Sequence, residues 1–341
     1  MGIVGFGFMG HCDADMFASF DEIELVAVAD TNPEQLKDAP EGVNTHDSIE
    51  GLLTEDIDVV MISTPNPSHI EMVEKAAKAG KHIICEKPVA MNVAELDRMI
   101  EVTKENNVLF TIHQQRRWDK DYRIMKEVYD KKLLGDAYVI KSHLYGFNGY
   151  MHDWHVDPKM GGGMLFDWGV HLIDQILDMV DSDIKSIYAE CRNVINDVVD
   201  DYFNIHIRFD NSVLAEIELG TYYLTPKREW FIGGNEGSAI IEHFDGSGKI
   251  VRTARLLENV PGKITMTAAG PTRSFGPAPD GLLLEEELPK VDVSHRNYFE
   301  HFLKALNGEE EIIVKPEQAR KVLQVMEAVR ESARTGEAVR L

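Results

Sequence analysis

The 341-residue sequence has few cysteines, no long hydrophobic run and no basic leader. Its three cysteines, Cys12, Cys85 and Cys191, are scattered and lack the paired spacing of a zinc site, a redox motif or a disulfide framework. We therefore expect small buried thiols in a reducing compartment. Because no run of about eighteen apolar residues occurs, no membrane span is predicted. No basic segment precedes the first apolar residues, which argues against a secretory signal and predicts a cytoplasmic location.

Basic residues are also scarce relative to acidic ones. Fifty-eight Asp and Glu face 35 Lys and Arg, which gives a formal net charge of -23. Such a chain repels a phosphate backbone, so no nucleic-acid partner is expected. The hydrophobic content of 44% is that of a globular protein, and the length exceeds that of one ordinary core. Two domains are therefore expected.

The first third of the chain alternates strand-like and helix-like segments. Its short runs rich in Val and Ile, such as "ELVAVAD", "DVVMIS", "HIIC" and "VLFTI", are typical of parallel strands buried on both faces. Helices are predicted at about 68–79 and 92–107, the second with Asn92 as N-cap and Glu95 three residues later. The pattern predicts an α/β domain over residues 1–118, a doubly wound parallel sheet of six strands.

Long alternating strands follow in the predicted second domain, residues 119–341. The stretch "YFNIHIRF" places apolar side chains on one face, and "VLAEIELG" completes a hairpin. "EWFIGGNEGSAIIEH" resembles another pair of strands, so an α+β domain with a large, mostly antiparallel sheet is expected. Residues 256–292 show no period and are predicted as long loops. Helices near 295–306 and 316–334 close the chain, and the last is expected to pack against the first domain.

The stretch "GFGFMG" carries three glycines in the spacing of a dinucleotide-binding turn. Gly5 permits the tight turn, Gly7 lets the backbone approach the pyrophosphate, and Gly10 allows close packing of helix and strand. The helix that follows offers its N-terminal N–H groups to the phosphates, so Phe8 and Met9 are also expected at the cofactor. The lead-in strand is short, which fits either a frayed strand or a native chain that begins earlier.

A carboxylate supports the cofactor interpretation. Asp30 ends the next strand, twenty residues after Gly10, where an acidic side chain meets the adenosine ribose hydroxyls in a dinucleotide fold. It would repel a 2′-phosphate, and Thr31 and Asn32 offer no arginine to hold one. NAD is therefore favoured over NADP. The alternative is a glycine-rich turn without a ligand.

Two further segments end parallel strands and should share the edge of the sheet with the glycine turn. They are "STPNPSH" and "CEKPVA". The cofactor-binding residues predicted in them are Thr64, Asn66, His69, Glu86 and Lys87. Lys87 could polarise a substrate oxygen near the nicotinamide; the alternative is a surface lysine fixed by Pro88.

A third signal is "GGGMLFDWGVHLIDQIL". Asp167 and His171 are four residues apart on a predicted helix and should share a face, with Asp174 close to it. Histidine suits proton transfer at neutral pH, and a nearby carboxylate can orient its ring. A capped helix with a hydrogen-bonded structural histidine is the alternative.

Histidines gather just before this segment as well. His152, Asp153 and His155 precede His171, but their spacing matches no zinc motif, so no metal site is predicted. Trp154, within the cluster, suits a wall that faces a sugar.

Taken in order, "GFGFMG", "STPNPSH", "CEKPVA", "HQQRRWDKDY", "GGGMLFDWGVHLIDQ" and the closing "KPEQARKVLQVMEAVRESARTG" resemble the glucose-fructose oxidoreductase, inositol dehydrogenase and rhizopine-catabolism (Gfo/Idh/MocA) family. The resemblance covers nearly the whole chain. It implies a nicotinamide domain joined to an open-faced sheet domain, which often mediates dimers or tetramers. It also implies that Lys87 contacts cofactor and substrate, and that Asp167 and His171 complete a triad with the histidine as acid and base.

The stretch "QQRRWD" is most similar to the inositol dehydrogenase branch, which implies that Arg116 or Arg117 reaches substrate hydroxyls. The implied activity is NAD-dependent, reversible oxidation of a secondary alcohol of a sugar, polyol or glycoside, by a homodimer or homotetramer. The substrate residues expected on these grounds are Lys87, Arg116, Arg117, Trp154, His155, Asp167 and His171. An NAD-dependent glycosidase, a glycoside 3-oxidase that retains its cofactor, and a non-catalytic nicotinamide-binding regulator are the alternatives.

Overall fold

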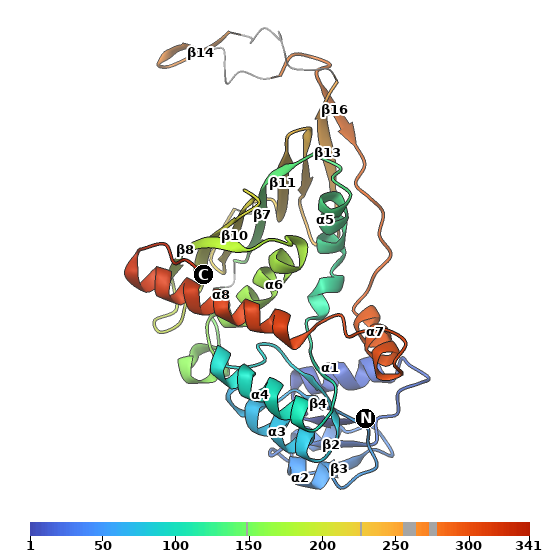
Figure 1. Cartoon of the computed structure of the whole chain (residues 1–341). Helices are drawn as coiled ribbons and strands as arrows, with labels where there is room; N and C mark the ends of the chain where they lie inside the picture. The colour runs from blue at the N-terminus through green and yellow to red at the C-terminus, as the bar shows by residue number, and fades with distance from the viewer. Residues whose placement is uncertain (148, 226, 255–263, 273–277) are drawn as a thin grey trace.

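Two large β-sheets with their covering helices lie one above the other in a computed structural model (Figure 1). The structure describes residues 1–147, 149–225, 227–254, 264–272 and 278–341. Among these residues, none of the helices combines the length and the apolar character that a bilayer crossing requires.

The first sheet has six strands, in the order β3-β2-β1-β4-β5-β6, and every neighbouring pair is parallel. Its strands are β1 (Gly2–Val4), β2 (Ala27–Ala29), β3 (Asn44–His46), β4 (Val59–Ile62), β5 (His82–Cys85) and β6 (Phe110–Ile112). The helices between them are α1 (Phe8–Phe17), α2 (Ile49–Leu52), α3 (His69–Lys78) and α4 (Val93–Glu105). The doubly wound parallel sheet is therefore confirmed, and the strand order reverses between β1 and β4.

Local sequence signals account for much of this domain. The strands β1, β2 and β4 are buried along their whole length, as apolar runs between two layers of helices should be. Helix α4 begins where predicted, because the Asn92 side chain accepts a hydrogen bond from the Glu95 N–H at 2.9 Å.

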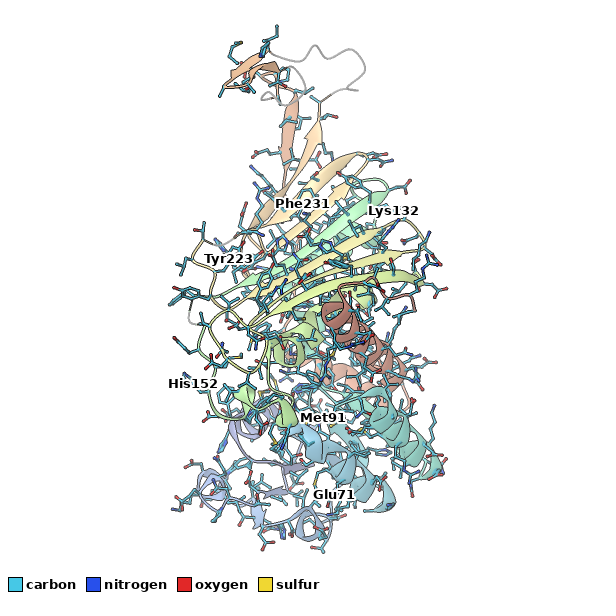
Figure 2. All side chains as sticks on the ribbon, turned by 90° about the vertical axis from the view of Figure 1, so that its left-hand side faces the viewer. Glu71, Met91, Lys132, His152, Tyr223 and Phe231 are labelled. Carbon is cyan, nitrogen blue, oxygen red and sulfur yellow. The ribbon has the colours of Figure 1, made fainter. Side chains whose placement is uncertain are left out.

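The second sheet has eight strands, in the order β16-β13-β12-β11-β7-β10-β9-β8, and only the pair of β7 and β10 is parallel. They are β7 (Ala137–Tyr145), β8 (Ile184–Arg192), β9 (Tyr202–Phe209), β10 (Leu214–Gly220), β11 (Trp230–Gly234), β12 (Gly237–Ile241), β13 (Gly248–Thr253) and β16 (Leu283–Glu286). Both predicted hairpins are confirmed, and the alternating apolar side chains of β9 are buried. Figure 2 shows one face of this sheet, with Tyr223 and Phe231 labelled, and no described helix lies across it.

The prediction of long loops over residues 256–292 was wrong for part of that segment. A short hairpin of β14 (Thr265–Thr267) and β15 (Gly270–Thr272) stands beyond the sheet (Figure 1), and β16 pairs with β13. Residues 256–263 and 273–277 lie outside the described residues. All of β16 is exposed, so its sequence shows no alternation, and pairing with β13 defines the strand.

The helices of the second half join the two sheets. Helix α5 (Lys120–Asp130) and helix α6 (Val170–Met179) contact each other beside the second sheet. Helix α7 (Arg296–Leu306) packs the Phe299 ring edge-on against Phe17 of α1. Helix α8 (Pro316–Thr335) contacts β8, and its Arg320 forms an ion pair with Asp97 of α4. The C-terminal helices thus touch both halves of the molecule and hold the edge of the first sheet against the second domain.

Candidate active site

The glycine turn after β1 is shaped by close contacts. Gly5 has a φ of +88°, and a side chain on it would lie 2.5 Å from the Ser63 backbone. A side chain on Gly10 would lie 2.3 Å from the Gly5 carbonyl oxygen, so the start of α1 packs directly against the turn. A side chain on Gly7 would meet nothing within 4 Å, because this position faces open space. Gly5 and Gly10 therefore allow close packing, and Gly7 leaves an open space beside the turn, here called the cradle.

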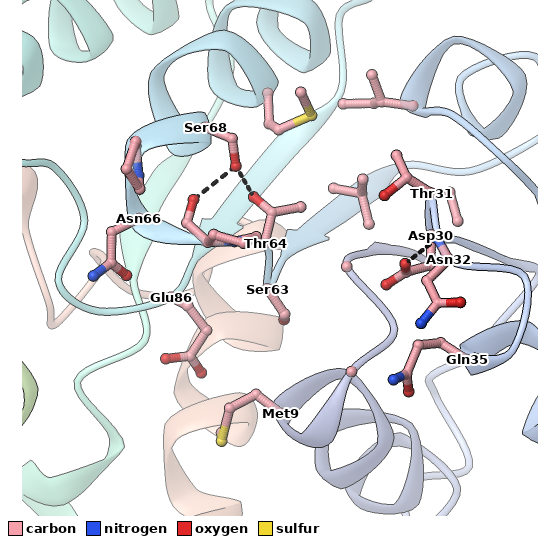
Figure 3. Close-up of a pocket in the computed structure, with 18 of the residues that line it drawn as sticks. Met9, Asp30, Thr31, Asn32, Gln35, Ser63, Thr64, Asn66, Ser68 and Glu86 are labelled. Atoms are coloured by element: carbon pink, nitrogen blue, oxygen red, sulfur yellow. Dashed lines mark hydrogen bonds between the residues drawn. The ribbon is translucent and has the colours of Figure 1, made fainter. Parts of the chain in front are cut away.

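That cradle belongs to a cavity of about 940 Å³ along the carboxyl edge of the first sheet. It is lined by the glycine turn and by the ends of β2, β4 and β5 (Figure 3). The second domain contributes Trp154, His155, Met160 and Asp167. The predicted site residues that line it are Gly5, Gly7, Phe8, Met9, Asp30, Thr64, Asn66, Glu86, Lys87, Trp154, His155 and Asp167. The cavity lies where the strand order reverses, which is the place where ligands bind in doubly wound sheets.

Asp30 lies at one end of this cavity, with Glu86 at the other (Figure 3). Its carboxylate accepts hydrogen bonds from the Phe6 N–H at 2.8 Å and the Asn32 N–H at 2.7 Å, so the backbone holds both oxygens in place. A fixed carboxylate beside an open glycine cradle and the first turn of α1 fits a dinucleotide, whose ribose diol donates to the carboxylate and whose phosphates meet free N–H groups.

Lys87 projects from the end of β5 toward the second domain. Its Nζ donates to Asp167 Oδ1 at 2.9 Å and to the Asp167 carbonyl oxygen at 3.0 Å. The two side chains are only 16% and 18% exposed. The pair is therefore a largely desolvated cation and carboxylate in the cavity wall, at the junction of the two domains. The alternative of a surface lysine fixed by Pro88 therefore does not apply to Lys87.

His171 lies in the first turn of α6 and is 2% exposed. Its Nδ1 is 2.8 Å from Gln114 Oε1. Because an amide oxygen only accepts, Nδ1 carries the proton, which leaves the lone pair on Nε2. Burial, together with the charges of Lys87 and Arg116, holds the pKa of His171 well below its usual value. The imidazole is therefore neutral at neutral pH, which is the form that accepts a proton.

The expected pairing of Asp167 with His171 is replaced by two other contacts. Asp167 lies in a π-helical turn, Leu165–Gly169, that precedes α6. The wider turn departs from the 3.6-residue period assumed for residues four apart, and such turns recur at functional sites. Asp167 contacts Lys87, and Gln114 contacts His171. Gln114 was missed by the sequence analysis, although it follows β6 at the same edge of the sheet.

The two arginines after β6 have different surroundings. Arg117 is 3% exposed and donates to both oxygens of Asp174, each at 2.7 Å. It is a buried structural arginine, so the expectation of a substrate contact at this position needs correction. The Arg116 guanidinium lies 4.1 Å from the centroid of the Trp168 ring and pairs with Asp119 at 3.0 Å. Of the two arginines, only Arg116 keeps an exposed portion, about a quarter of its side chain.

His69, which was expected at the cofactor, is not among the residues that line the cavity. It is fully buried, with Nε2 2.7 Å from the Thr64 carbonyl oxygen and Nδ1 3.1 Å from the Pro88 carbonyl oxygen. Burial lowers the pKa of His69. The ring thus bridges the two segments that end β4 and β5, and it supports the wall instead of contacting a ligand.

Histidines and carboxylates lie close together at two places in the described part of the chain. Among the described residues, the groups of three close enough to hold one ion are Asp13, Glu86 and His113, and His143, Glu216 and Glu218. Neither group includes His152, Asp153 or His155. In both, protein partners already occupy the carboxylates, such as Lys227 at 2.7 Å from Glu218 and His113 at 2.6 Å from Glu86.

A dinucleotide cleft with a lysine near one end and a buried neutral histidine is typical of a nicotinamide-dependent oxidoreductase. A comparison with known families shows which family of these oxidoreductases the chain belongs to. Residues 1–114 match the oxidoreductase family with an NAD-binding Rossmann fold, and residues 122–240 match the Gfo/Idh/MocA C-terminal domain. The chain belongs to the Gfo/Idh/MocA family and is an NAD-binding oxidoreductase.

Individual relatives agree with this assignment. The crystal structure of an NAD-binding protein from Listeria innocua is 36% identical, with a TM-score of 0.94, over 100% of this chain and 99% of that one. The scyllo-inositol 2-dehydrogenase (NADP(+)) of Bacillus subtilis is 25% identical over 98% of this chain and 93% of its own length. An uncharacterized oxidoreductase of Schizosaccharomyces pombe is 32% identical over 45% of this chain, a match that spans 43% of the yeast protein.

Proposed function

We propose that the protein reversibly oxidises a secondary alcohol of a sugar, a polyol such as an inositol, or a glycoside. The observation that carries this proposal is the pair of Lys87 and Asp167, which line the cavity and meet at 2.9 Å. His171 follows Asp167 by four residues; it is a buried, neutral histidine outside the residues that line the cavity. This is the set of groups that removal of a hydroxyl proton requires.

Each residue has a distinct part in the reaction. Bound NAD supplies the acceptor for the hydride. His171 Nε2 takes the hydroxyl proton, and Gln114 keeps the ring in the tautomer that can do so. The Lys87 ammonium stabilises negative charge as it develops on the substrate oxygen. Asp167 accepts from Lys87 and so fixes the position of that charge.

Aromatic and polar side chains near these residues suit a hydroxylated substrate. The rings of Trp154 and His155 stack with centroids 3.8 Å apart and line the cavity. Arg116, whose guanidinium lies over the Trp168 ring at 4.1 Å from its centroid, offers donors that match ring hydroxyls. We assign substrate contact to Arg116 and not to Arg117, because the latter is fully engaged in a buried ion pair.

A homodimer or homotetramer through the second sheet is part of the same proposal. The face that Figure 2 shows uncovered offers cross-strand polar contacts, such as Lys141 with Glu216 at 2.7 Å and Tyr202 with Glu218 at 2.8 Å. Sedimentation of the purified protein tests this part of the proposal, and a monomer at all concentrations would contradict it.

The activity is tested by a screen of monosaccharides, inositols and glycosides with NAD, followed by the absorbance of reduced nicotinamide. Accumulation of NADH with a free sugar or polyol supports the proposal. Release of a leaving group without net NADH indicates a glycosidase, and retained cofactor after dialysis with a glycoside substrate indicates a glycoside oxidase. No turnover on any substrate, with cofactor bound, indicates a regulator.

The role of His171 has its own test. We expect His171→Asn to lower turnover by about 10²–10⁴ while NAD affinity stays nearly intact, because the imidazole acts only on the substrate proton. The control is His82→Asn on the opposite, amino edge of the sheet, where Asn can still accept the Leu109 N–H that His82 Nδ1 accepts at 2.9 Å. Unchanged turnover in His171→Asn would contradict the assignment.

A further inference from the structure

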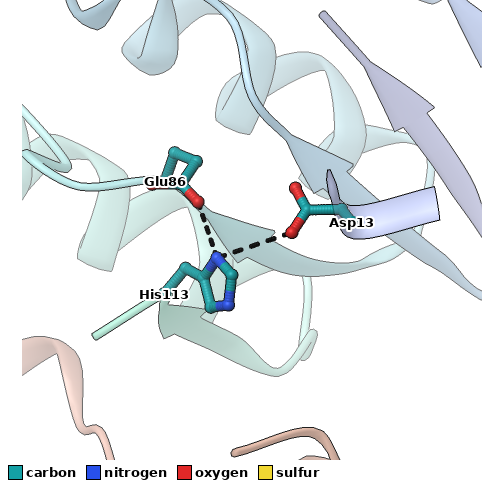
Figure 4. A group of neighbouring side chains, drawn as sticks. All are labelled: Asp13, Glu86 and His113. Carbon is teal, nitrogen blue, oxygen red and sulfur yellow. Dashed lines mark hydrogen bonds and ion pairs between the residues drawn. The ribbon is translucent and has the colours of Figure 1, made fainter. Parts of the chain in front are cut away.

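Three buried titratable side chains meet at the wall of the cofactor cavity: Asp13 of α1, Glu86 after β5 and His113 after β6 (Figure 4). His113 Nδ1 lies 2.6 Å from Glu86 Oε1 and 3.8 Å from Asp13 Oδ1. All three residues are less than 5% exposed. The reaction proposed above assigns no step to this group.

The group is connected to the cavity through two of its oxygens. Glu86 Oε2 accepts the backbone N–H of Lys87 at 3.0 Å, and Asp13 Oδ2 accepts the Ser63 hydroxyl at 3.0 Å. Glu86 and Ser63 both line the cavity. A buried carboxylate therefore forms part of the wall at the end opposite Asp30, which is the end left for the nicotinamide half of the cofactor once the adenosine ribose lies at Asp30.

The charge of the group changes near neutral pH. Burial would raise the pKa of Glu86, but the charge and hydrogen bond of His113 outweigh it, and the pKa is lowered. Burial would likewise lower the pKa of His113, but Glu86 outweighs it and raises the pKa. Burial raises the pKa of Asp13 to about 7, although the charge of His113 acts in the opposite direction. The raised pKa of His113 favours its protonated form, whose charge offsets that of Glu86, so ionisation of Asp13 gives the group a net negative charge.

The surrounding groups do not cancel that charge. The rings of Tyr298 and Phe299 of α7 cover His113, with centroids 4.8 Å and 5.2 Å away. The titratable or charged side chains that interact with the group are Cys12 on α1, His69 on α3, Cys85 on β5, Lys87 after β5, His171 on α6 and Tyr298 on α7. The thiols, the phenol and the imidazoles of His69 and His171 are neutral at neutral pH, and Lys87 is already paired with Asp167.

We infer that the Asp13, His113 and Glu86 group sets the preference of this enzyme between oxidised and reduced cofactor. The nicotinamide ring is positively charged when oxidised and uncharged when reduced. A buried negative charge at the ring's end of the cavity stabilises the oxidised form more than the reduced form, and the wall screens this effect less than water would. The coupling is reciprocal, so binding of NAD⁺ promotes ionisation of Asp13 and releases protons near neutral pH, whereas binding of NADH does not.

The test measures the dissociation constants of NAD⁺ and NADH, without any substrate, between about pH 6 and pH 8.5, on either side of neutrality. In the wild type we expect affinity to shift toward NAD⁺, relative to NADH, by roughly tenfold as pH rises through neutrality. Asp13→Asn should abolish this shift and leave the ratio at its low-pH value. Glu86→Gln should lower the preference for NAD⁺ throughout the range.

The matched control is Asp15→Asn, which removes the same charge from an exposed position on the same helix. Solvent and salt screen that position, so the ratio of the NAD⁺ and NADH dissociation constants should change with pH as it does in the wild type. A wild-type ratio that does not change with pH would overturn the inference. So would equal behaviour of Asp13→Asn and Asp15→Asn, or an Asp13→Asn variant that loses affinity for both forms in proportion. Because no substrate is present, the outcome is separate from that of the proposed alcohol oxidation.

Discussion

The two ends of the cofactor cavity are built in different ways. At the adenosine end, Asp30 is held by N–H groups of Phe6 and Asn32, all within the first thirty-two residues of the chain. At the catalytic end, Lys87 meets Asp167 and Gln114 meets His171, across 80 and 57 residues. The first end is a local structure of one turn and one strand. The second exists only when two domains pack, so its side chains depend on many distant contacts.

The catalytic end should respond most strongly to loss of one charge. Lys87→Met should lower turnover by about 10²–10³, because a preorganised cation that stabilises the developing alkoxide is lost and Asp167 is left without its partner. Steady-state kinetics with saturating NAD measure the effect. Lys78→Met, on the exposed side of α3 at 60% side-chain exposure, is the control. Comparable rates in the two variants would show that the charge at the domain junction is dispensable.

A substitution at the adenosine end should change the cofactor specificity and leave the turnover nearly unchanged. Asp30→Ser should improve the affinity for NADP relative to NAD by roughly tenfold, because the carboxylate that repels a 2′-phosphate is removed. Turnover with saturating NAD should change little, since Asp30 contacts no catalytic residue. Binding titrations with both cofactors give the ratio, and Asp38→Asn on the nearby exposed surface serves as control. If the ratio stays at the wild-type value, Asp30 does not select the cofactor.

The smallest effect is expected at Gln114, where a substitution should shift the pH dependence of the catalytic end. In the wild type, burial keeps the pKa of His171 low, so its neutral form persists and the acid limb of the rate profile should lie below about pH 6.5. Gln114→Glu places a carboxylate against Nδ1, which favours the imidazolium and raises that pKa. The acid limb should therefore move to higher pH, with activity recovered at alkaline pH. A pH profile of kcat that does not move would show that Gln114 does not position His171.

Much of the fold follows from the sequence because its signals are local. Apolar runs of β1 and β4 indicate a sheet buried on both faces, and the Asn92 cap marks the start of α4. The alternation along β9 predicts one buried face. The edge strand β16 carries no such signal, because all of its side chains are exposed and its pairing partner β13 lies about thirty residues earlier.

The same difference between local signals and distant contacts applies to the candidate site. Strand-end reasoning correctly brings Lys87 and Asn66 to the cavity, because parallel strands end at one edge. It does not distinguish a side chain that faces the cavity from one that faces the interior, and this is where His69 and Arg117 differ from expectation. The π-helical turn at Asp167 is another feature that helical spacing does not reveal.

By itself, the sequence determined the glycine turn, the position of Asp30 and the class of cofactor, because turn conformation, strand period and the order of motifs act over short stretches of chain. Only the tertiary structure decided which partners the ionisable side chains have: Lys87 with Asp167, His171 with Gln114, and Glu86 with His113. The physical reason is that burial forces each of these groups to find a partner, and packing of distant elements, not sequence spacing, determines which group is within reach.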